Sequence, residues 1–443
     1  MPEKTGKSSF YGWVMLPILC LVYSIPIGFA LYGPPIINTF MAEELQLQRW
    51  QVNIGYSIIG MVLGLGALCI PWLLNRFGPK NTLAIGAGLA AVSSILMALL
   101  GSATVSFSGQ SYPVIYWVIC FFVGLGTSFG SVVPVQALVL LWFNVHRALA
   151  MGLVLGGGAI GGFIYPQIIS YFITAFGNDW RTGWYVIAIA CTIGALVAML
   201  WIRNRPEDLG QHPDGLSSQQ LEEAAINSGN ALIRTYRSPV NWATSDAMRT
   251  RSLWLIIIST GALFFLWQVL LSQTPAHLLD RGFSANDPVL FLQPAFIYGL
   301  ILAFSIVGRL SVSFLGERIE PRLIMAVAGS MLVIGGLLFW LAYPDNIWAV
   351  FLFPVFAGIG FGATYVAIPL IVGNYFGVGS FANLAQILNP INCVFQYSGP
   401  AVSGMIYDST HSYGLAVLIA CIAGLISVGL LFFCRPPVPH QST

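Results

Sequence analysis

Long apolar runs, separated by short polar stretches, recur along almost the whole chain. Runs of about 20 or more mostly apolar residues occupy residues 12–40, 51–74, 82–103, 113–142, 148–176, 183–202, 252–279, 289–314, 321–343, 347–374, 380–407 and 413–434. The hydrocarbon core of a bilayer is about 30 Å thick, and about 20 residues of helix cross it. The pattern therefore predicts an all-α membrane protein with about twelve transmembrane helices.

One long polar segment interrupts the pattern and predicts three parts. These are an N-terminal six-helix bundle at 1–202, a linker at 203–250 and a C-terminal six-helix bundle at 251–443. Similar loops, Asn75–Lys80 and Glu317–Arg322, follow the second and eighth runs, which indicates an internal repeat. Duplicated bundles with a site near the midplane are a recurring transporter design. We therefore expect two pseudo-symmetric bundles.

Composition supports the membrane prediction and excludes other classes. The 443 residues are 57% hydrophobic and 8% charged, whereas soluble domains carry roughly 25% charged residues. The seven cysteines lie in apolar runs without metal-ligand spacing, so we expect no metal and no cofactor. Basic patches interleaved with aromatics are missing, which argues against a nucleic-acid partner. Nucleophile triads and carboxylate pairs are missing from the spans, which argues against an enzyme.

Lysine and arginine predict the orientation, because cytoplasmic loops carry an excess of both. One side of the predicted topology holds three cations: Arg49, Arg181 and Arg281. The other side holds Lys4, Lys7, Arg76, Lys80, Arg147, Arg203, Arg205, Arg234, Arg237, Arg249, Arg251, Arg318, Arg322 and Arg435. Both termini and the linker are then cytoplasmic. Short outer loops without an Asn-x-Ser/Thr site favour a multi-pass protein of a bacterial inner membrane.

The first repeated loop resembles the signature of the major facilitator superfamily, Gly-x-x-x-Asp-Arg-x-Gly-Arg-Lys. Arg76, Gly78 and Lys80 match it, while Asn75 replaces the aspartate and Pro71 the leading glycine. The resemblance covers essentially the whole chain. It implies that this loop, together with Arg318 of the second copy, takes part in gating.

Further segments resemble the monocarboxylate transporter and oxalate:formate antiporter-like branch of that superfamily. They lie in order at matching helix ends: Phe10–Trp13, Trp142–Phe143, Arg147–Gly152, Arg205–Gly215, Arg249–Trp254 and Gly404–Asp408. The resemblance implies a secondary active transporter of a small organic monoanion that works by alternating access. Its expected partners are that anion, the lipid bilayer and protons, and the expected functional unit is a monomer.

Arg309 is the one cation inside a predicted span. An intramembrane charge normally faces a bundle interior or an aqueous cavity, and arginine binds both oxygens of a carboxylate. The alternative is an arginine that snorkels to the interface. The branch carries an Asp-x-x-x-Arg pair in the eighth span, and Arg309 matches its arginine, whereas Ser305 replaces its aspartate. This replacement leaves both proton coupling and anion exchange open.

Other candidates are neutral or titratable. The sixteen acidic residues all lie in loops, tails or helix ends, so one buried cation favours a substrate with one negative charge. His277 is the candidate proton carrier, with a structural hydrogen bond as the alternative. Pro390 kinks its helix and places Asn389 and Asn392 beside the break. Neutral polar residues that line a cavity or pack between helices are Tyr23, Tyr32, Tyr56, Tyr116, Gln136, Gln268, Tyr298, Tyr365, Asn389, Asn392 and Gln396.

We take Arg309, Asn392, Asn389, Tyr32, Gln136, Tyr365 and Gln268 as the candidate substrate-binding set. Two other functions remain open. The first is a facilitator-type exporter of neutral or amphipathic molecules, in which Arg309 is structural. The second is a membrane sensor that binds without turnover.

Overall fold

The computed structural model describes residues 10–101, 105–107, 110–143, 146–215, 236–238, 240–316, 318–377 and 380–437. Helices of the first half are α1 (Tyr11–Ile25), the π-helical turn η1 (Pro26–Leu31), α2 (Pro34–Glu44), α3 (Arg49–Gly66), η2 (Ala67–Cys69), α4 (Ile70–Ala98), α5 (Val114–Phe129), α6 (Val132–Trp142), α7 (Arg147–Ala175) and α8 (Trp180–Trp201). Strands β1 (Val105–Phe107) and β2 (Gln110–Tyr112) form an antiparallel hairpin between α4 and α5.

The short helices η3 (Pro206–Leu209), η4 (Pro213–Gly215) and α10 (Thr244–Met248) lie between the halves. Helices of the second half are α11 (Arg251–Asp280), η5 (Leu290–Leu292), α12 (Pro294–Leu315), α13 (Pro321–Trp340), η6 (Pro344–Asn346), α14 (Ile347–Phe376), α15 (Phe381–Thr410) and α16 (Gly414–Phe433).

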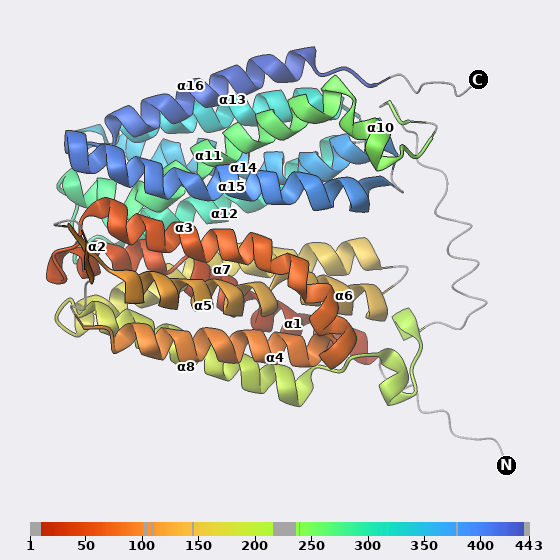
Figure 1. Cartoon of the computed structure of the whole chain (residues 1–443), viewed down its shortest axis with the longest axis horizontal. Coiled ribbons are helices and arrows are strands. Elements are labelled where there is room, and N and C mark those ends of the chain that lie inside the picture. The colour runs from red at the N-terminus through yellow and green to blue at the C-terminus, as the bar shows by residue number, and fades with distance from the viewer. Residues whose placement is uncertain are drawn as a thin grey trace.

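The long helices form two groups that lie side by side (Figure 1). In the first group α4 packs on α5 and α8, and α7 packs on α1. In the second group α14 packs on α12 and α13, and α11 packs on α15 and α16. The groups meet along two seams, α3 with α15 and α7 with α12. We call them the first and second bundle.

The number of membrane crossings is less sharp than the sequence pattern predicts. Within the described residues, ten helical runs are long and apolar enough to cross a bilayer. One of them, Arg49–Ala98, has 50 residues, which is enough for two crossings. The 30-residue helix α15 does not meet the same apolar criterion. Twelve crossings result when Arg49–Ala98 is counted as two and α15 is added.

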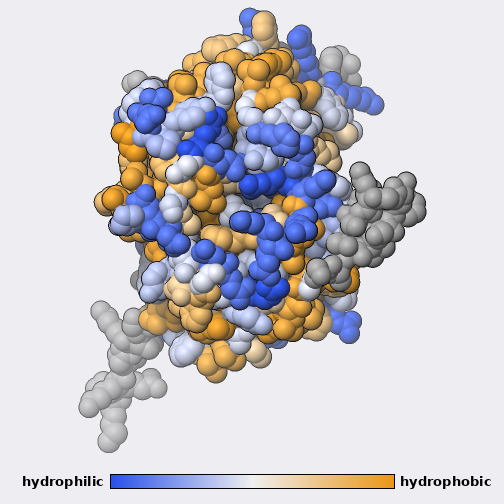
Figure 2. Space-filling view, turned by 90° about the vertical axis from the view of Figure 1, so that its left-hand side faces the viewer, coloured by the Kyte–Doolittle hydropathy of each residue, from blue (hydrophilic) through white to orange (hydrophobic). Residues whose placement is uncertain are grey.

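The pair of bundles has two distinct ends. At the linker end, Tyr11 at the start of α1 donates a hydrogen bond to the carbonyl of Trp201, and Ser252 on α11 donates one to the carbonyl of Arg435. The opposite end, which we call the hairpin end, carries β1 and β2 (Figure 1). Figure 2 views the hairpin end, where hydrophilic residues gather in the middle and hydrophobic residues form much of the rim.

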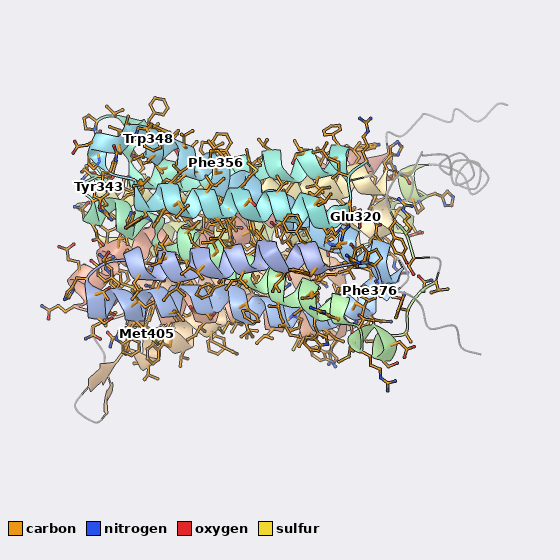
Figure 3. All side chains as sticks on the ribbon, turned by 90° about the horizontal axis from the view of Figure 1, so that it is seen from above. Glu320, Tyr343, Trp348, Phe356, Phe376 and Met405 are labelled. Atoms are coloured by element: carbon orange, nitrogen blue, oxygen red, sulfur yellow. The ribbon has the colours of Figure 1, made fainter. Side chains whose placement is uncertain are left out.

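Hydrophobic side chains also cover the long sides of the bundles, as expected of a lipid-facing surface (Figure 3). Trp348 and Met405, for example, are 51% and 50% exposed. The predicted loop at Asn75–Lys80 lies inside α4, where Gly78 alone departs from helical geometry with φ of 75°. The backbone N–H of Lys80 donates to Oδ1 of Asn204 and ties this turn to the end of α8.

Close packing of α12 on α14 depends on glycine. A Cβ atom on Gly362 of α14 would collide with the Ser305 carbonyl of α12, and one on Gly308 of α12 would collide with the Ile359 carbonyl. Small residues let helix backbones approach each other in membranes. The backbones of the two helices therefore lie in direct contact at these glycines.

We predict that Gly362→Ala destabilises the protein, because an added methyl group forces the α12 backbone away. Overpacking of this kind costs about 1–3 kcal/mol. Gly373→Ala on the same helix is the matched control, because a Cβ there meets no atom within 4 Å. Thermal unfolding of the purified protein measures both, and equal melting temperatures for the two variants would contradict the packing argument.

Candidate functional site

Arg309 of α12 lies at the seam between the bundles. Its Nη1 is 3.5 Å from the carbonyl oxygen of Leu155 on α7, a long hydrogen bond that joins the second bundle to the first. Its guanidinium carbon lies 5.4 Å from the centre of the Tyr365 ring on α14, within cation–π range. The guanidinium is therefore held between α7, α12 and α14 by a carbonyl and an aromatic face.

Tyrosines from the first bundle complete these surroundings. The charge of Arg309 acts electrostatically on the hydroxyl groups of Tyr23 and Tyr32. Tyr32 directly follows the π-helical turn η1 and packs against Gly162 of α7, where a Cβ would lie 2.9 Å from its ring. Single π-helical turns are frequent at functional sites. The predicted residues Arg309, Tyr32 and Tyr365 thus lie together.

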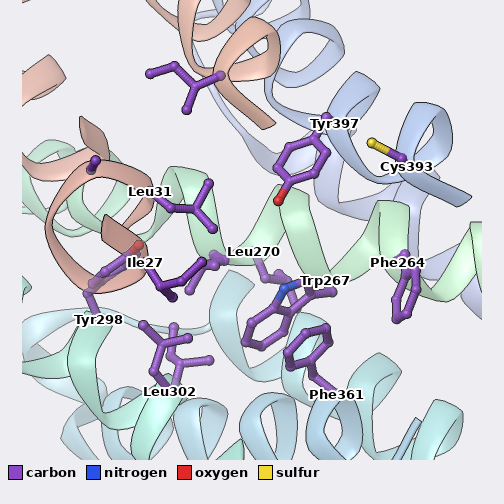
Figure 4. Packing of buried hydrophobic residues seen from close by; sticks show 14 of the residues in the cluster. Ile27, Leu31, Phe264, Trp267, Leu270, Tyr298, Leu302, Phe361, Cys393 and Tyr397 are labelled. Atoms are coloured by element: carbon purple, nitrogen blue, oxygen red, sulfur yellow. The ribbon is translucent and has the colours of Figure 1, made fainter. Parts of the chain in front are cut away.

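An aromatic wall that the sequence did not single out lies beside Tyr365. Trp267 of α11 stacks face to face on Phe361 of α14, with ring centroids 3.7 Å apart (Figure 4). The ring centroid of Phe264 lies 6.0 Å from that of Phe361 and 6.5 Å from that of Tyr365. Aromatic residues are common in buried cores, so their sequence positions carried no signal. Tyr365 is 45% exposed, so one face of this wall is open.

Gln268 lies in a chain of side-chain hydrogen bonds across the bundles. Its Nε2 donates to the Tyr56 hydroxyl of α3, and its Oε1 accepts from Nε2 of Gln396 on α15, both at 3.1 Å. It lies about one helical turn beyond Phe264 on α11. Gln268 therefore links α3 of the first bundle to α11 and α15 of the second, about one helical turn from the aromatic wall.

The remaining substrate-binding candidates fall in different surroundings. Asn392 is 2% exposed and accepts a hydrogen bond from Thr260 of α11 through Oδ1, while its Nδ2 has no partner among the described residues. Asn389 is exposed on α15. Gln136 is half-buried on α6 and, in the part of the chain that the structure describes, makes no hydrogen bond. Within the described residues, no hydrogen bond or ring contact joins any of these three residues to Arg309.

His277 lies on α11, beyond Phe264 of the aromatic wall and toward the hairpin end. It follows Phe264 by 13 residues on α11, which corresponds to about 20 Å of helix. Its ring stacks on Phe339, and Nε2 lies 3.1 Å from the Phe339 carbonyl oxygen. It lines a cavity of about 520 Å³ at the hairpin end of the second bundle, with Asp280, Arg281, Trp340, Tyr343, Tyr407, His411, Ser412 and Tyr413.

The candidate gating loops lie at the linker end. Arg76 is exposed and stacks over the rings of Trp72 and Phe77. Gly78 supplies the positive φ of the turn, and Lys80 is half-buried beside Asn204. Arg318 of the second copy is exposed at the end of α12. Within the described residues no group of His, Cys, Asp and Glu is arranged to hold a metal ion.

A polar contact that the sequence did not predict closes the hairpin end. Both carboxylate oxygens of Asp408 on α15 accept hydrogen bonds from the first backbone N–H groups of α3, those of Arg49 and Trp50, at 3.1 and 2.8 Å. The Arg49 side chain pairs with Asp280 of α11 at 3.1 Å. A carboxylate at a helix N-terminus is favoured by its unpaired N–H groups and its dipole. We call these three residues, Arg49, Asp280 and Asp408, the latch.

We predict that Asp408→Asn opens the hairpin end, because the amide loses the charge that interacts with the α3 N-terminus. Asp179→Asn is the matched control, since Asp179 caps α8 inside one bundle by accepting from the Arg181 N–H. Pulsed electron paramagnetic resonance between labels at Val114→Cys and Leu415→Cys, with the native cysteines replaced, measures the separation. Longer distances in Asp408→Asn alone are expected, and unchanged distances would contradict the latch.

The sequence of the chain also matches a known family over most of its length. A model of the Major Facilitator Superfamily matches residues 18–395. The chain belongs to this superfamily. It is therefore a multi-pass membrane transporter and not an enzyme, as the sequence pattern predicted. The resemblance to the monocarboxylate-like branch is likewise confirmed, because transporters of that branch are among the relatives.

Three relatives show the range of similarity. The chain is 24% identical to the probable sulfoacetate transporter SauU of Cupriavidus necator, over 94% of this chain and 92% of the relative. It is 24% identical to the probable L-galactonate transporter of Escherichia coli, over 91% and 85%. It is 21% identical to human monocarboxylate transporter 2, over 91% and 81%.

Solved structures confirm the fold. The nucleoside transporter NupG superposes with a TM-score of 0.70 at 13% identity, covering 95% of this chain and 99% of that protein. The xylose transporter XylE of E. coli superposes with a TM-score of 0.68 at 14% identity, covering 96% and 100%. At these identities the likeness concerns the fold alone.

Proposed function

We propose that the protein is a secondary active transporter of small organic monoanions and that Arg309 binds the carboxylate of its substrate. The observation that carries this proposal is the position of Arg309 at the seam of the two bundles. A site between bundles is reached from either side of the membrane as the bundles rock. A guanidinium on a helix that faces lipid would have no such access.

Arginine chemistry favours a carboxylate over a neutral ligand at this position. The planar guanidinium presents paired N–H donors that match both oxygens of a carboxylate. Its contacts include a long hydrogen bond to the Leu155 carbonyl and the face of Tyr365. An incoming carboxylate offers shorter, charge-assisted hydrogen bonds than this carbonyl does. Binding there exchanges a weak contact for a stronger one.

The named substrates of the relatives agree with an organic anion. Sulfoacetate, L-galactonate and monocarboxylates, as printed in the names of three relatives, all carry at least one acidic group. Arg309 offers one positive charge at the seam, so we propose a monoanion.

Coupling is proposed to proceed without an acidic partner on α12. Ser305 occupies the turn before Arg309, and its hydroxyl donates to the carbonyl of Leu302. His277, about 20 Å beyond Phe264 along α11, hydrogen-bonds the Phe339 carbonyl and stacks on its ring. Net uptake against a negative interior costs an anion about 2.3 kcal/mol per 100 mV. Anion exchange, or entry together with a proton on the substrate, meets that requirement.

The transport cycle is proposed to be alternating access in a functional monomer. The latch residues Arg49, Asp280 and Asp408 hold the hairpin end closed in this structure. The positive charges near the linker end support a cytoplasmic position for that end, and a bacterial inner membrane is the proposed location. Release of the latch would then open Arg309 to the outside.

We predict that Arg309→Ala abolishes carboxylate uptake into proteoliposomes and that Arg309→Lys retains a small fraction of it, because lysine keeps the charge but not the paired donors. Loss of one charge-assisted hydrogen-bond partner costs about 1.5–3 kcal/mol, or roughly 10- to 150-fold in affinity. Normal thermal unfolding of both variants is the control. Uptake that persists in Arg309→Ala would show that Arg309 is structural and would favour an exporter of neutral compounds.

We further predict that monocarboxylates raise the melting temperature of the purified protein and that Arg309→Ala removes this effect. A ligand at 100 times its dissociation constant stabilises the folded state by about 2.7 kcal/mol. Dicarboxylates of equal length are the comparison, because their second charge has no cation at the proposed site. A larger shift with the dicarboxylates would contradict the monoanion proposal.

A further inference from the structure

The first transmembrane segment is broken beside Arg309, and the break leaves backbone oxygens without their helical partners. In an α-helix the carbonyl of residue i accepts a hydrogen bond from the N–H of residue i+4. Pro34 and Pro35 occupy the positions that would donate to the carbonyls of Ala30 and Leu31, and proline has no N–H. The nearby donors are used elsewhere, because Gly33 N–H bonds the Phe29 carbonyl.

Both carbonyls belong to buried residues. Ala30 is 0% exposed and Leu31 4% exposed, and neither carbonyl accepts a hydrogen bond within the part of the chain that the structure describes. Lipid offers no donors, and unpaired backbone groups at membrane depth are tolerated where they are buried in protein or line a water-filled cavity. The η1–α2 break therefore presents two unsatisfied acceptors at the bundle seam.

An unsatisfied hydroxyl group belongs to the same buried cluster as Ala30 and Leu31. Tyr298 of α12 is 0% exposed, and its hydroxyl has no hydrogen bond among the described residues. Its hydroxyl lies in the same neighbourhood as those of Tyr32 and Tyr56. Figure 4 shows Tyr298 on the same side of the buried cluster as Leu31. One donor and two acceptors without partners among the described residues thus belong to one buried cluster of α12 and the broken segment.

The same face of α12 connects this region to Arg309. Tyr298, Leu302, Ser305 and Arg309 follow one another at spacings of four, three and four residues, which places them on one side of the helix. Leu302 and Tyr32 both contact Gly162, where a Cβ would lie 2.7 and 2.9 Å from them. Tyr298 and Arg309 are about 16 Å apart along the axis, and Tyr32 lies between them.

We propose that this break is a subsite that binds hydroxyl groups of the substrate. The carbonyls of Ala30 and Leu31 accept hydrogen bonds from these hydroxyl groups, and the hydroxyls of Tyr298 and Tyr32 donate hydrogen bonds to them. This inference rests on the proposed function. It implies that the substrate is a small hydroxylated carboxylate whose charged end binds Arg309. The subsite is closed while the latch is closed, and it opens as the bundles part at the hairpin end.

A neutral hydroxyl group fits this subsite better than a metal cation does. Free carbonyls of broken membrane helices also bind cations. The Arg309 charge, however, acts on Tyr32 within the subsite, so a cation beside Tyr32 would be repelled. A hydroxyl group carries no net charge, and it satisfies a carbonyl and a tyrosine at the same time because it both donates and accepts.

The test compares uptake of length-matched acids with and without hydroxyl groups into proteoliposomes: glycerate against propionate, and gluconate against hexanoate. The wild-type protein should prefer the hydroxylated member of at least one pair. Tyr298→Phe should weaken that preference about tenfold, because one hydrogen bond is lost, and should leave the unsubstituted acid unchanged. Tyr171→Phe, on the exposed side of α7, is the matched control and should retain the preference.

Pro34→Ala is an independent variant, since it returns an N–H to the Ala30 carbonyl. It should weaken the same preference without touching Tyr298. Equal uptake of both members of each pair by the wild-type protein would overturn the subsite. Equal losses of uptake for both members of a pair in Tyr298→Phe would also overturn it. A sodium dependence of uptake that Pro34→Ala abolishes would do the same.

Failure of the proposed function looks different. In that case no carboxylate is carried at all, and Arg309→Ala changes nothing. The melting temperature of the protein with and without the neutral polyol xylitol then tests the subsite independently of carboxylate transport. Stabilisation that is lost in Tyr298→Phe supports it, and no stabilisation of the wild-type protein overturns it.

Discussion

Hydrocarbon offers no hydrogen-bond partners, and this constraint organises the whole molecule. Each polar group that the chain carries into the bilayer must find its partner in protein or in water between the bundles. Arg309 reaches the Leu155 carbonyl and the Tyr365 ring, and Gln268 reaches Tyr56 and Gln396. These partners lie across or along the seam, so the polar groups collect where the bundles separate. The same constraint that threatens folding therefore assembles a site.

The structure combines rigid bundles with a weak closure. Within the second bundle, Gly308 and Gly362 let α12 and α14 approach so closely that neither helix can slide without its partner. At the hairpin end, by contrast, the ion pair of Arg49 and Asp280 is about a quarter exposed, and exposed pairs contribute only about 0–1 kcal/mol. Asp408 at the α3 N-terminus adds a second modest contribution. On the proposed cycle, opening of the hairpin end would therefore cost little energy.

Much of the fold could be read from the sequence, because membrane insertion depends on local properties. A run of about 20 apolar residues specifies a crossing regardless of its neighbours, and the helices begin and end close to the predicted bounds. Arg309 could likewise be found as a charge inside an apolar run. Proline lacks an N–H, and the first segment is interrupted before Pro34, whereas α15 continues as one helix through Pro390. The sequence pattern separates twelve runs, whereas ten helical runs of the described residues are apolar and long enough, since α15 is more polar and Arg49–Ala98 forms one run.

The sequence by itself thus determined which segments enter the bilayer and which charge enters with them. Only the tertiary structure decided the partners: that Arg309 faces Leu155 and Tyr365, that Gln268 ties the bundles together, and that Asp408 caps a helix 358 positions earlier in the chain. It also placed His277 in a cavity at the hairpin end. The physical reason is that hydrophobicity acts residue by residue along the chain, whereas hydrogen bonds and ring contacts depend on which helix faces overlap in space.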